Sequence, residues 1–414
     1  MGNANGHRVV ARYEGDAAGG SIVTMPDGQL GQAEVLFPTD APFVPTGVER
    51  LARELVEGPF SGFRSYTTAH YVVLSSGSEG YAEGTARLLE SLYQGLADLL
   101  RRQGLPIHEA EIPLVAIIDR DEGDFRSRQA LRPEVQAYYD PLTNRIALYE
   151  DSERHARSPE MTAMNRPRIV AHEGTHQILQ NIGVQPRLAS WPAWLSEGLA
   201  EYCAPTATNP DGTWKGCGTI NPLHMATLRD LDDPLARWLP KGALPGSSLP
   251  PPNGRTSIET LLTRAELAPT DYAVAWSLTY YLAQKRPREF KSFLARMVCS
   301  RPLDSSTPRD RLSEFREAFG PDLARLDQKV RIHLSSRRGY PELPYYCVYF
   351  EQWQADGTLF QDAIASQSPA VIEQWLKERE NPDALQPGVQ EILAMPTKLA
   401  AALLLRSWGF EGED

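Results

Sequence analysis

The chain has 414 residues, 42% of them hydrophobic, and a formal net charge of −11, with a mean hydropathy of −0.38 and a pI near 5.4. This length allows two or three units and a substantial core. Because the acidic charge is spread along the chain, it argues against nucleic acid or an anionic membrane surface as a partner. No run approaches the length of a membrane span, and residues 1–7 carry neither a basic nor an apolar leader region. No export signal is therefore visible, and secretion or a periplasmic location stays open.

The first third of the chain predicts strands and helices in alternation. Residues 1–58 form a β-rich segment, in which short β-type runs alternate with Gly, Asp and Pro. Apolar positions between residues 81 and 100 recur with helical spacing. The further expected elements are a helix at 48–56, strands at 70–75 and 113–119, and a short helix at 122–131.

A hairpin is expected at residues 135–149. Its two β-type runs, 135–139 and 145–149, flank the pentapeptide Asp-Pro-Leu-Thr-Asn at 140–144. Those residue types favour a tight turn between antiparallel strands.

The motif His-Glu-Gly-Thr-His at 172–176 lies in a run with helical apolar flanks. Side chains four residues apart share one helix face, so His172 and His176 can reach a single zinc-type ion. Glu173, at the edge of that face, can accept a proton from a metal-bound water without being a ligand. A catalytic zinc site uses three protein ligands and leaves one position open, so a third ligand is required.

Glu197 is the candidate third ligand, because a short connection after Ile182 lets a second helix fold back beside the first. Pro192 suits the first turn of that helix. Glu201 lies one turn beyond Glu197 on the same face, where it can accept the other ring N–H of a ligating His and so fix its orientation. The alternative is two buried helices whose Glu side chains are merely solvated.

The second half of the chain predicts mostly helices. Residues 206–254 are rich in Gly, Pro, Asn and Asp, and the stretch 245–254 is expected to be a lid or rim loop. His224 in this region is interpreted as an ordinary surface or core residue. A strong helix is expected at 271–284, after Thr270 as N-cap. Further helices are expected at 221–231, 289–298, 310–319, 321–334, 371–377 and 398–408.

Four cysteines are present and none has the CxxC spacing of a second zinc site. Cys203 and Cys217 bracket a loop that directly follows the second motif, which suits a disulfide, and Cys299 could then pair with Cys347. Buried thiols are the alternative. Disulfides would indicate an oxidising compartment.

These motifs resemble those of the gluzincins, zinc metallopeptidases with HExxH followed by a Glu on a later helix. The run Trp-Leu-Ser-Glu-Gly-Leu-Ala at 194–200 is similar to the Trp-Leu-Asn-Glu-Gly-Phe-Ala stretch of aminopeptidase-N-like enzymes. Together with His-Glu-Gly-Thr-His-Gln it is closer still to a bacterial peptidase-MA-like domain of unknown function. The resemblance covers about residues 60–335 and is sharp at the motifs. In thermolysin-like enzymes an acidic residue four positions after the ligand Glu orients the first His, and Glu201 matches that place.

The resemblance also implies a role for Tyr272. The helix at 271–284 resembles the Tyr-Glu-Lys-Gly helix of aminopeptidase-N-like enzymes, whose first Tyr stabilises the tetrahedral oxyanion, and Tyr272 takes its place. A phenol can donate to an oxygen that becomes negative only in the transition state. The alternative is an aromatic core residue. Gluzincin-like folds further pair a sheet edge with extended substrate, and either strand of the hairpin at 135–149 could serve.

We therefore expect an α+β, zincin-like fold with a small mixed sheet packed on the HExxH helix and an α-helical second lobe. The expected units are 1–58, a catalytic domain at 59–340 and a mostly helical segment at 341–414. His172, His176 and Glu197 would hold one Zn²⁺ with water in the fourth position, and Glu173 and Tyr272 would be catalytic, with Glu201 behind the first His.

The expected activity is hydrolysis of peptide or protein substrates. The Gly-x-Met-Glu-Asn strand by which aminopeptidase-N-like enzymes bind a free amine is not found upstream of His172, which favours an endopeptidase over an aminopeptidase. Two alternatives stay open. The protein could hydrolyse a non-peptide amide, or it could be a non-hydrolytic, zinc-containing binding protein of the cell envelope. A purely structural site would have no use for Glu173.

Overall fold

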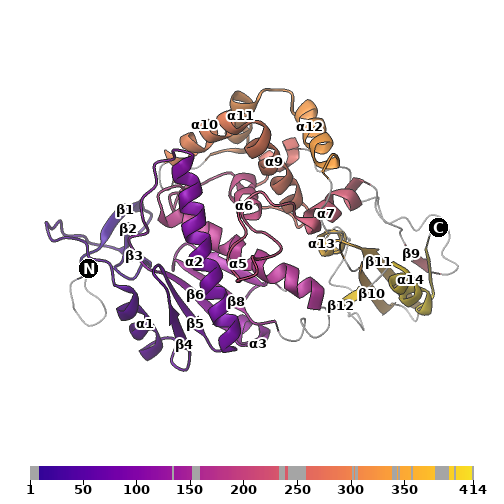
Figure 1. Cartoon of the computed structure of the whole chain (residues 1–414), viewed down its shortest axis with the longest axis horizontal. Coiled ribbons are helices and arrows are strands. Elements are labelled where there is room, and N and C mark those ends of the chain that lie inside the picture. Colours follow the sequence, from indigo (N-terminus) through magenta and orange to yellow (C-terminus); the bar gives the residue numbers. More distant parts are fainter. Residues whose placement is uncertain are drawn as a thin grey trace.

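The computed structural model of the chain combines several sheets with helices on both faces of the largest one (Figure 1). This confirms the mixed α and β class. The residues described are 9–132, 135–151, 159–232, 238–240, 258–300, 303, 306–337, 343, 346–355, 358–377, 391–395 and 398–412. The predicted loop at 245–254 lies outside them.

A five-stranded sheet in the order β4-β5-β6-β8-β7 forms the base of the site. Its strands are β4 (Arg64–Thr67), β5 (Tyr71–Ser75), β6 (Leu114–Asp119), β7 (Ala137–Asp140) and β8 (Arg145–Tyr149). β5, β6 and β8 are parallel, while β4 and β7 run antiparallel to their neighbours. The predicted hairpin is confirmed as β7 and β8, and β7 lies at the outer edge of the sheet.

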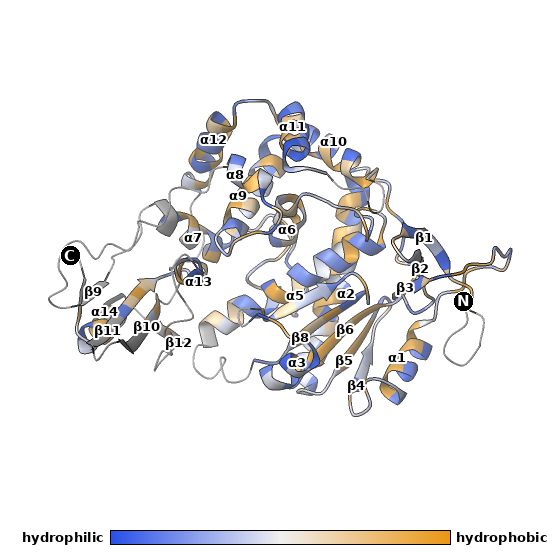
Figure 2. Ribbon diagram, turned by 180° about the vertical axis from the view of Figure 1, so that it is seen from behind, coloured by the Kyte–Doolittle hydropathy of each residue, from blue (hydrophilic) through white to orange (hydrophobic). Residues whose placement is uncertain are grey.

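Alternating residues of the inner strands face two different helical layers. Tyr71 and Val73 belong to the core formed with α2 (Glu79–Arg102) and α5 (Pro159–Asn181). Val72 and Leu74 instead pack with α1 (Val48–Glu57) on the opposite face, and Phe125 of α3 (Glu122–Arg128) contacts that face at β8. Figure 2 shows the apolar strands between these layers. Because strands buried on both sides need apolar side chains at every position, β5 and β6 read as continuous hydrophobic runs.

The remaining helices form the α-helical part that was expected. They are α6 (Ala193–Tyr202), α7 (Pro222–Asp232), α8 (Ile258–Thr263), α9 (Asp271–Lys285), α10 (Pro287–Val298), α11 (Pro308–Phe319) and α12 (Leu323–Ser335). Trp194 of α6 is fully buried, with ring centroids 6.0 Å from Phe293 and 5.4 Å from Phe315. One continuous core thus joins α6 and the later helices to α2 and α5.

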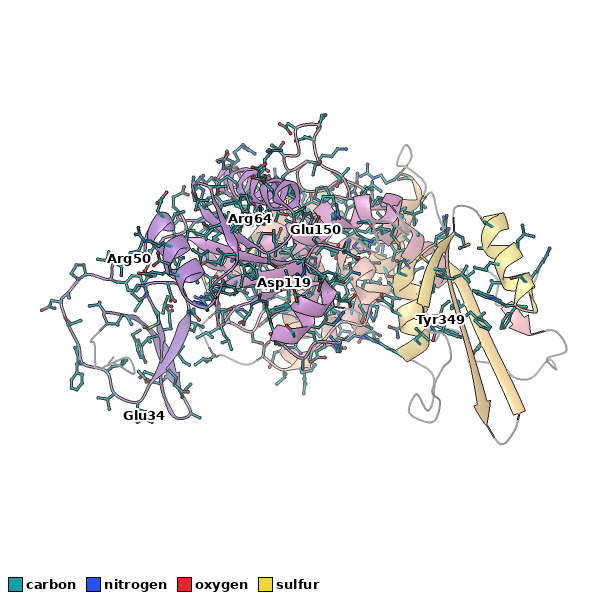
Figure 3. The ribbon with its side chains drawn as sticks, turned by 90° about the horizontal axis from the view of Figure 1, so that it is seen from below. Glu34, Arg50, Arg64, Asp119, Glu150 and Tyr349 are labelled. Atoms are coloured by element: carbon teal, nitrogen blue, oxygen red, sulfur yellow. A yellow bond between two sulfur atoms is a disulfide. The ribbon has the colours of Figure 1, made fainter. Side chains whose placement is uncertain are left out.

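Two three-stranded sheets lie at opposite ends of the molecule, as Glu34 and Tyr349 mark in Figure 3. The N-terminal sheet, which confirms the β-rich lead-in, contains β1 (Arg12–Ala17), β2 (Gly20–Thr24) and β3 (Leu30–Ala33). The C-terminal unit, 346–412, contains β10 (Tyr346–Ala355), β11 (Thr358–Ser366), α13 (Pro369–Lys377), β12 (Glu391–Met395), α14 (Lys398–Ser407) and β13 (Phe410–Gly412), which pairs with β9 (Trp238–Pro240).

The expectation of a mostly helical segment at 341–414 was therefore wrong in its secondary structure. α13 and α14 lie where helices were predicted, but β10 pairs on both sides, with β11 and with β12. Cys347, Val348, Tyr349 and Phe350 are all buried. Aromatic and β-branched residues favour such a central strand, although this Pro- and Tyr-rich stretch was expected to be only a boundary.

The predicted disulfide between Cys203 and Cys217 is present. The suggested second pair is wrong, since Cys299 is exposed on the helical part and Cys347 is buried in the C-terminal sheet, and neither is disulfide-bonded. None of the helices in the described part of the chain combines the length and apolar character that crossing a membrane requires.

Candidate metal centre

α5 carries both histidines of the motif and packs closely on α2. A side chain at Gly174 would lie 2.7 Å from a methyl group of Leu92 and 2.8 Å from one of Leu89, so the glycine lets the two helices approach. His172 and His176 are one helical turn apart and only 7% and 8% exposed. Their imidazoles therefore point inward from α5, away from bulk solvent.

α6 brings Glu197 to the two histidines. The helix begins directly after Pro192 and is anchored by the buried side chains of Trp194 and Leu195. Its other side packs along α9, where a Cβ at Gly198 would lie 2.4 Å from the Thr279 hydroxyl. The buried anchor and the close helix contact fix the direction in which Glu197 points.

The three candidate ligands converge as predicted. The Nε2 atoms of His172 and His176 are 3.2 Å apart, and Oε2 of Glu197 lies 3.2 Å and 3.4 Å from them, respectively. Ligand atoms placed tetrahedrally at about 2.0–2.1 Å from an ion are separated by about 3.3–3.4 Å. The group therefore fits three corners of such a site in number, chemistry and spacing, and could bind a metal ion.

Charge complementarity accompanies this geometry. Burial acts to lower the pKa of His172, but the carboxylates of Glu201 and Glu197 outweigh it and raise that pKa well above its ordinary value. For Glu197, burial acts to raise the pKa, whereas His176 and His172 lower it below its ordinary value. Glu197 is thus an anion beside the two imidazoles, as a ligand to a divalent cation must be.

Glu201 lies behind His172, as its spacing from Glu197 predicts. Its Oε1 atom is 3.1 Å from Nδ1 of His172, a distance that suits a hydrogen bond, although the alignment in this conformer does not complete one. The Arg168 guanidinium donates to the same oxygen at 2.8 Å, and His224 Nε2 donates to the other oxygen at 2.7 Å. Burial acts to raise the pKa of Glu201, but Arg168 and His224 lower it well below its ordinary value.

The second histidine has its own contacts. Nδ1 of His176 lies 3.4 Å from the Ser196 hydroxyl, which in turn lies 3.5 Å from Oε1 of the buried Gln185. Sequence reasoning did not single out either residue. Ser196 directly precedes Glu197, so α6 supplies both a candidate ligand and the hydroxyl that contacts the imidazole of His176.

Glu173 is held by the edge strand. Its Oε2 atom accepts a hydrogen bond of 2.8 Å from the backbone N–H of Tyr139 on β7. That N–H points away from β8, and alternation along a strand places the N–H and C=O of Ala137 on the same outer side. Of the two hairpin strands considered, β7 is the one whose outer edge adjoins the centre.

Tyr272 comes from the first turn of α9. Its ring centroid lies 6.3 Å from that of His172. Burial raises the pKa of the Tyr272 phenol well above its ordinary value, and the nearby carboxylates of Glu197 and Glu173 add to the effect. The phenol therefore keeps its proton and remains a hydrogen-bond donor.

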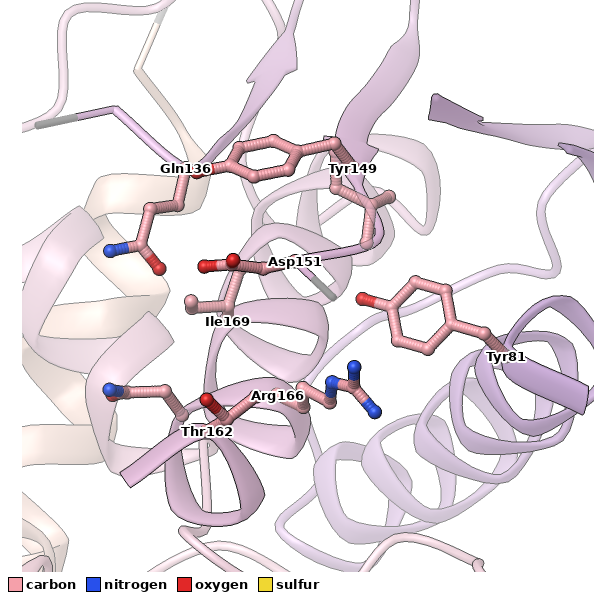
Figure 4. Close-up of a pocket in the computed structure, with 9 residues that line it drawn as sticks. Tyr81, Gln136, Tyr149, Asp151, Thr162, Arg166 and Ile169 are labelled. Carbon is pink, nitrogen blue, oxygen red and sulfur yellow. The ribbon is translucent and has the colours of Figure 1, made fainter. Parts of the chain in front are cut away.

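A small pocket of about 30 Å³, partly open to solvent, lies beside the first half of α5 (Figure 4). Ile169, one turn before His172, and Gln136, next to β7, are on its wall. Arg166 lies with its guanidinium 5.0 Å from the ring centroid of Tyr81. The other lining residues are Leu148, Tyr149, Asp151, Thr162 and Asn165.

All six residues predicted for the site thus lie in one cluster drawn from α5, α6 and α9. The interpretation of His224 as an ordinary residue missed its contact with Glu201. No local pattern could have revealed this contact, because the two residues are on different helices. Arg168 carried a weak signal, being one turn before His172 on the same helix face.

Comparison with known proteins adds one match. A family model described as "Protein of unknown function (DUF1570)" matches residues 168–304. The matched stretch runs from Arg168 through both motifs to beyond Tyr272, and so contains the whole cluster. A search of curated proteins found no match.

Proposed function

We propose that the protein is a zinc-dependent metallopeptidase, and an endopeptidase in particular. The observation that carries the proposal is the convergence of His172, His176 and Glu197 at the separations of a tetrahedral ligand set, with Glu173 beside them. Zn²⁺ fits this mixture of imidazole and carboxylate ligands. When bound, it would lower the pKa of a coordinated water and polarise the scissile carbonyl.

The roles of the surrounding residues follow from their contacts. Glu173 accepts the proton of the attacking water and returns it to the leaving amine. Its hydrogen bond from the Tyr139 N–H keeps the carboxylate at the edge of the sheet. The Tyr272 phenol donates to the oxygen on which negative charge develops.

β7 supplies a surface for an extended chain. Peptide substrate adds to the outer edge of β7 through main-chain hydrogen bonds, which orient the scissile bond without requiring a particular side chain. An edge that binds an extended chain through its backbone suits an endopeptidase, as does the missing free-amine motif. The disulfide between Cys203 and Cys217 suits an oxidising compartment, such as the cell exterior or the periplasm.

The decisive experiment compares wild type with Glu173→Gln. Zinc content should stay near one ion per chain, while cleavage of internally quenched peptides should fall about 10²- to 10⁴-fold through loss of the base. The matched control is Glu83→Gln, which removes the same charge from an exposed position on α2 and should cleave like wild type.

The outcomes separate the alternatives. Cleavage that survives in Glu173→Gln would contradict the assignment of the base. Activity confined to aminoacyl reporters with a free amine would favour an aminopeptidase. Bound zinc with no turnover over a broad peptide library would favour a binding protein.

A further inference from the structure

Glu201 is held from two sides, and each side comes from a different part of the chain. Oε1 accepts a hydrogen bond of 2.8 Å from the Arg168 guanidinium, and Oε2 accepts one of 2.7 Å from His224 Nε2. The side chain of Glu201 is almost completely buried, at 2% exposure. A carboxylate that orients a ligating imidazole must itself be fixed, since an unrestrained one can rotate away from the ring.

The contact from Arg168 is local, whereas the contact from His224 is not. Arg168 lies one turn before His172 on α5, so helix geometry alone brings it to the ring and to Glu201. His224 belongs to α7, which packs along α9 and shares an apolar cluster with Met161 near the start of α5. The second restraint on Glu201 therefore depends on how α7 is placed.

Two interactions place His224 on α7. The Asn221 side chain accepts hydrogen bonds from the backbone N–H groups of Leu223 and His224, at 2.9 Å and 3.3 Å, and so caps the start of the helix. The imidazole then lies 5.4 Å, between ring centroids, from the buried Trp276 of α9. Because Trp276 confines the imidazole of His224 on one side, its Nε2 atom points toward Glu201.

The C-terminal unit covers the next turn of α7. The Thr227 hydroxyl lies 2.6 Å from the Ser368 hydroxyl, both buried, and Arg229 donates to Gln367. Leu223 belongs to one apolar cluster with residues of β10 and α13. A continuous set of contacts thus runs from the C-terminal unit through α7 and His224 to Glu201 and His172.

We propose that His224 is a positioning residue of the metal centre and that the C-terminal unit, 346–412, stabilises it through α7. His224 keeps Glu201 beside His172, with Oε1 3.1 Å from Nδ1, so that Nε2 of the same imidazole faces Glu197 and is available to a metal. This gives a role to a part of the chain in which the sequence shows no chemistry. The inference rests on metal binding at the site and is independent of peptide hydrolysis.

Two amide variants test the role of His224. The amide nitrogen of Gln can occupy the place of a histidine Nε2, whereas that of Asn falls one carbon short, at the place of Nδ1. His224→Gln should therefore bind zinc within about twofold of wild type, and His224→Asn about tenfold more weakly, at the low end of the effect of outer contacts on metal affinity. Affinity is measured by competition with a chromophoric chelator.

A merely structural role would affect both amides alike. Equal zinc affinities for His224→Gln and His224→Asn would therefore overturn the proposal. In peptide assays, His224→Asn should lower kcat and leave KM nearly unchanged, because His224 does not line the edge strand. If wild type binds zinc but cleaves no peptide, the proposed function fails while the affinity comparison still decides this inference.

A separate variant tests whether the C-terminal unit stabilises the metal centre through α7. Thr227→Val keeps the shape of the side chain and removes its hydroxyl from Ser368. It should weaken zinc binding by a few-fold, about two- to fivefold, because its effect reaches the metal through His224. Wild-type zinc affinity in Thr227→Val would remove the C-terminal unit from the proposal. If neither amide variant folds, the same result would overturn the proposal as a whole.

Discussion

Replacing Gly198 by Ala tests the close approach of α6 and α9, which sets the position of Glu197. An added Cβ would lie 2.4 Å from the Thr279 hydroxyl oxygen and 2.8 Å from the backbone carbonyl oxygen of Ala275. The hydroxyl can rotate, but the carbonyl cannot. The helices must therefore separate by roughly 0.6 Å to restore an ordinary contact.

The expected magnitude follows from two opposing effects. Overpacking in a well-packed core costs about 1–3 kcal/mol, while Ala stabilises a helix by about 1 kcal/mol relative to Gly. The net loss in the free energy of unfolding should therefore lie between zero and about 2 kcal/mol. Zinc affinity should fall as well, because Glu197 directly precedes the altered residue and moves with the backbone.

Urea denaturation and chelator competition measure the two effects. Gly84→Ala on α2 is the matched control, because a Cβ there meets nothing within 4 Å, and it should gain up to about 1 kcal/mol from helix propensity. If Gly198→Ala proves as stable as Gly84→Ala and binds zinc as tightly as wild type, the close contact does not set the geometry of Glu197.

Three further predictions concern different parts of the molecule. Replacing both Cys203 and Cys217 by Ser should lower the free energy of unfolding by about 3 kcal/mol, as expected for a loop of this size, and reductant should destabilise wild type but not the variant. Tyr272→Phe should reduce kcat about 10²- to 10³-fold through loss of the oxyanion donor, and an equal loss of zinc would instead indicate a structural role. Burial acts to raise the pKa of Glu90, but hydrogen bonds from Thr68 and other groups lower it below the ordinary 4.5. The stability advantage of wild type over Glu90→Gln should accordingly be complete above about pH 4.5 and disappear as the pH falls through the lower folded pKa, and an advantage that persists at pH 2 would contradict this.

Local spacing predicted much of the candidate site. The four-residue interval between His172 and His176 guarantees a shared face on any helix, and the same interval relates Glu197 to Glu201. The loop between Cys203 and Cys217 is short enough for the chain itself to bring the thiols together. These predictions held because each depends on a few consecutive residues and on backbone geometry that varies little.

The chain's own sequence therefore determined the two helical motifs, the strands buried on both faces, and the residue types able to hold a metal. Only the tertiary structure decided that β7 rather than β8 lies at the sheet edge, and that its Tyr139 N–H meets Glu173. Only packing brought His224 to Glu201, and β10 to the centre of its own sheet. The physical reason is that contacts between distant segments depend on how whole elements pack, whereas periodicity within one element records only which of its faces is buried.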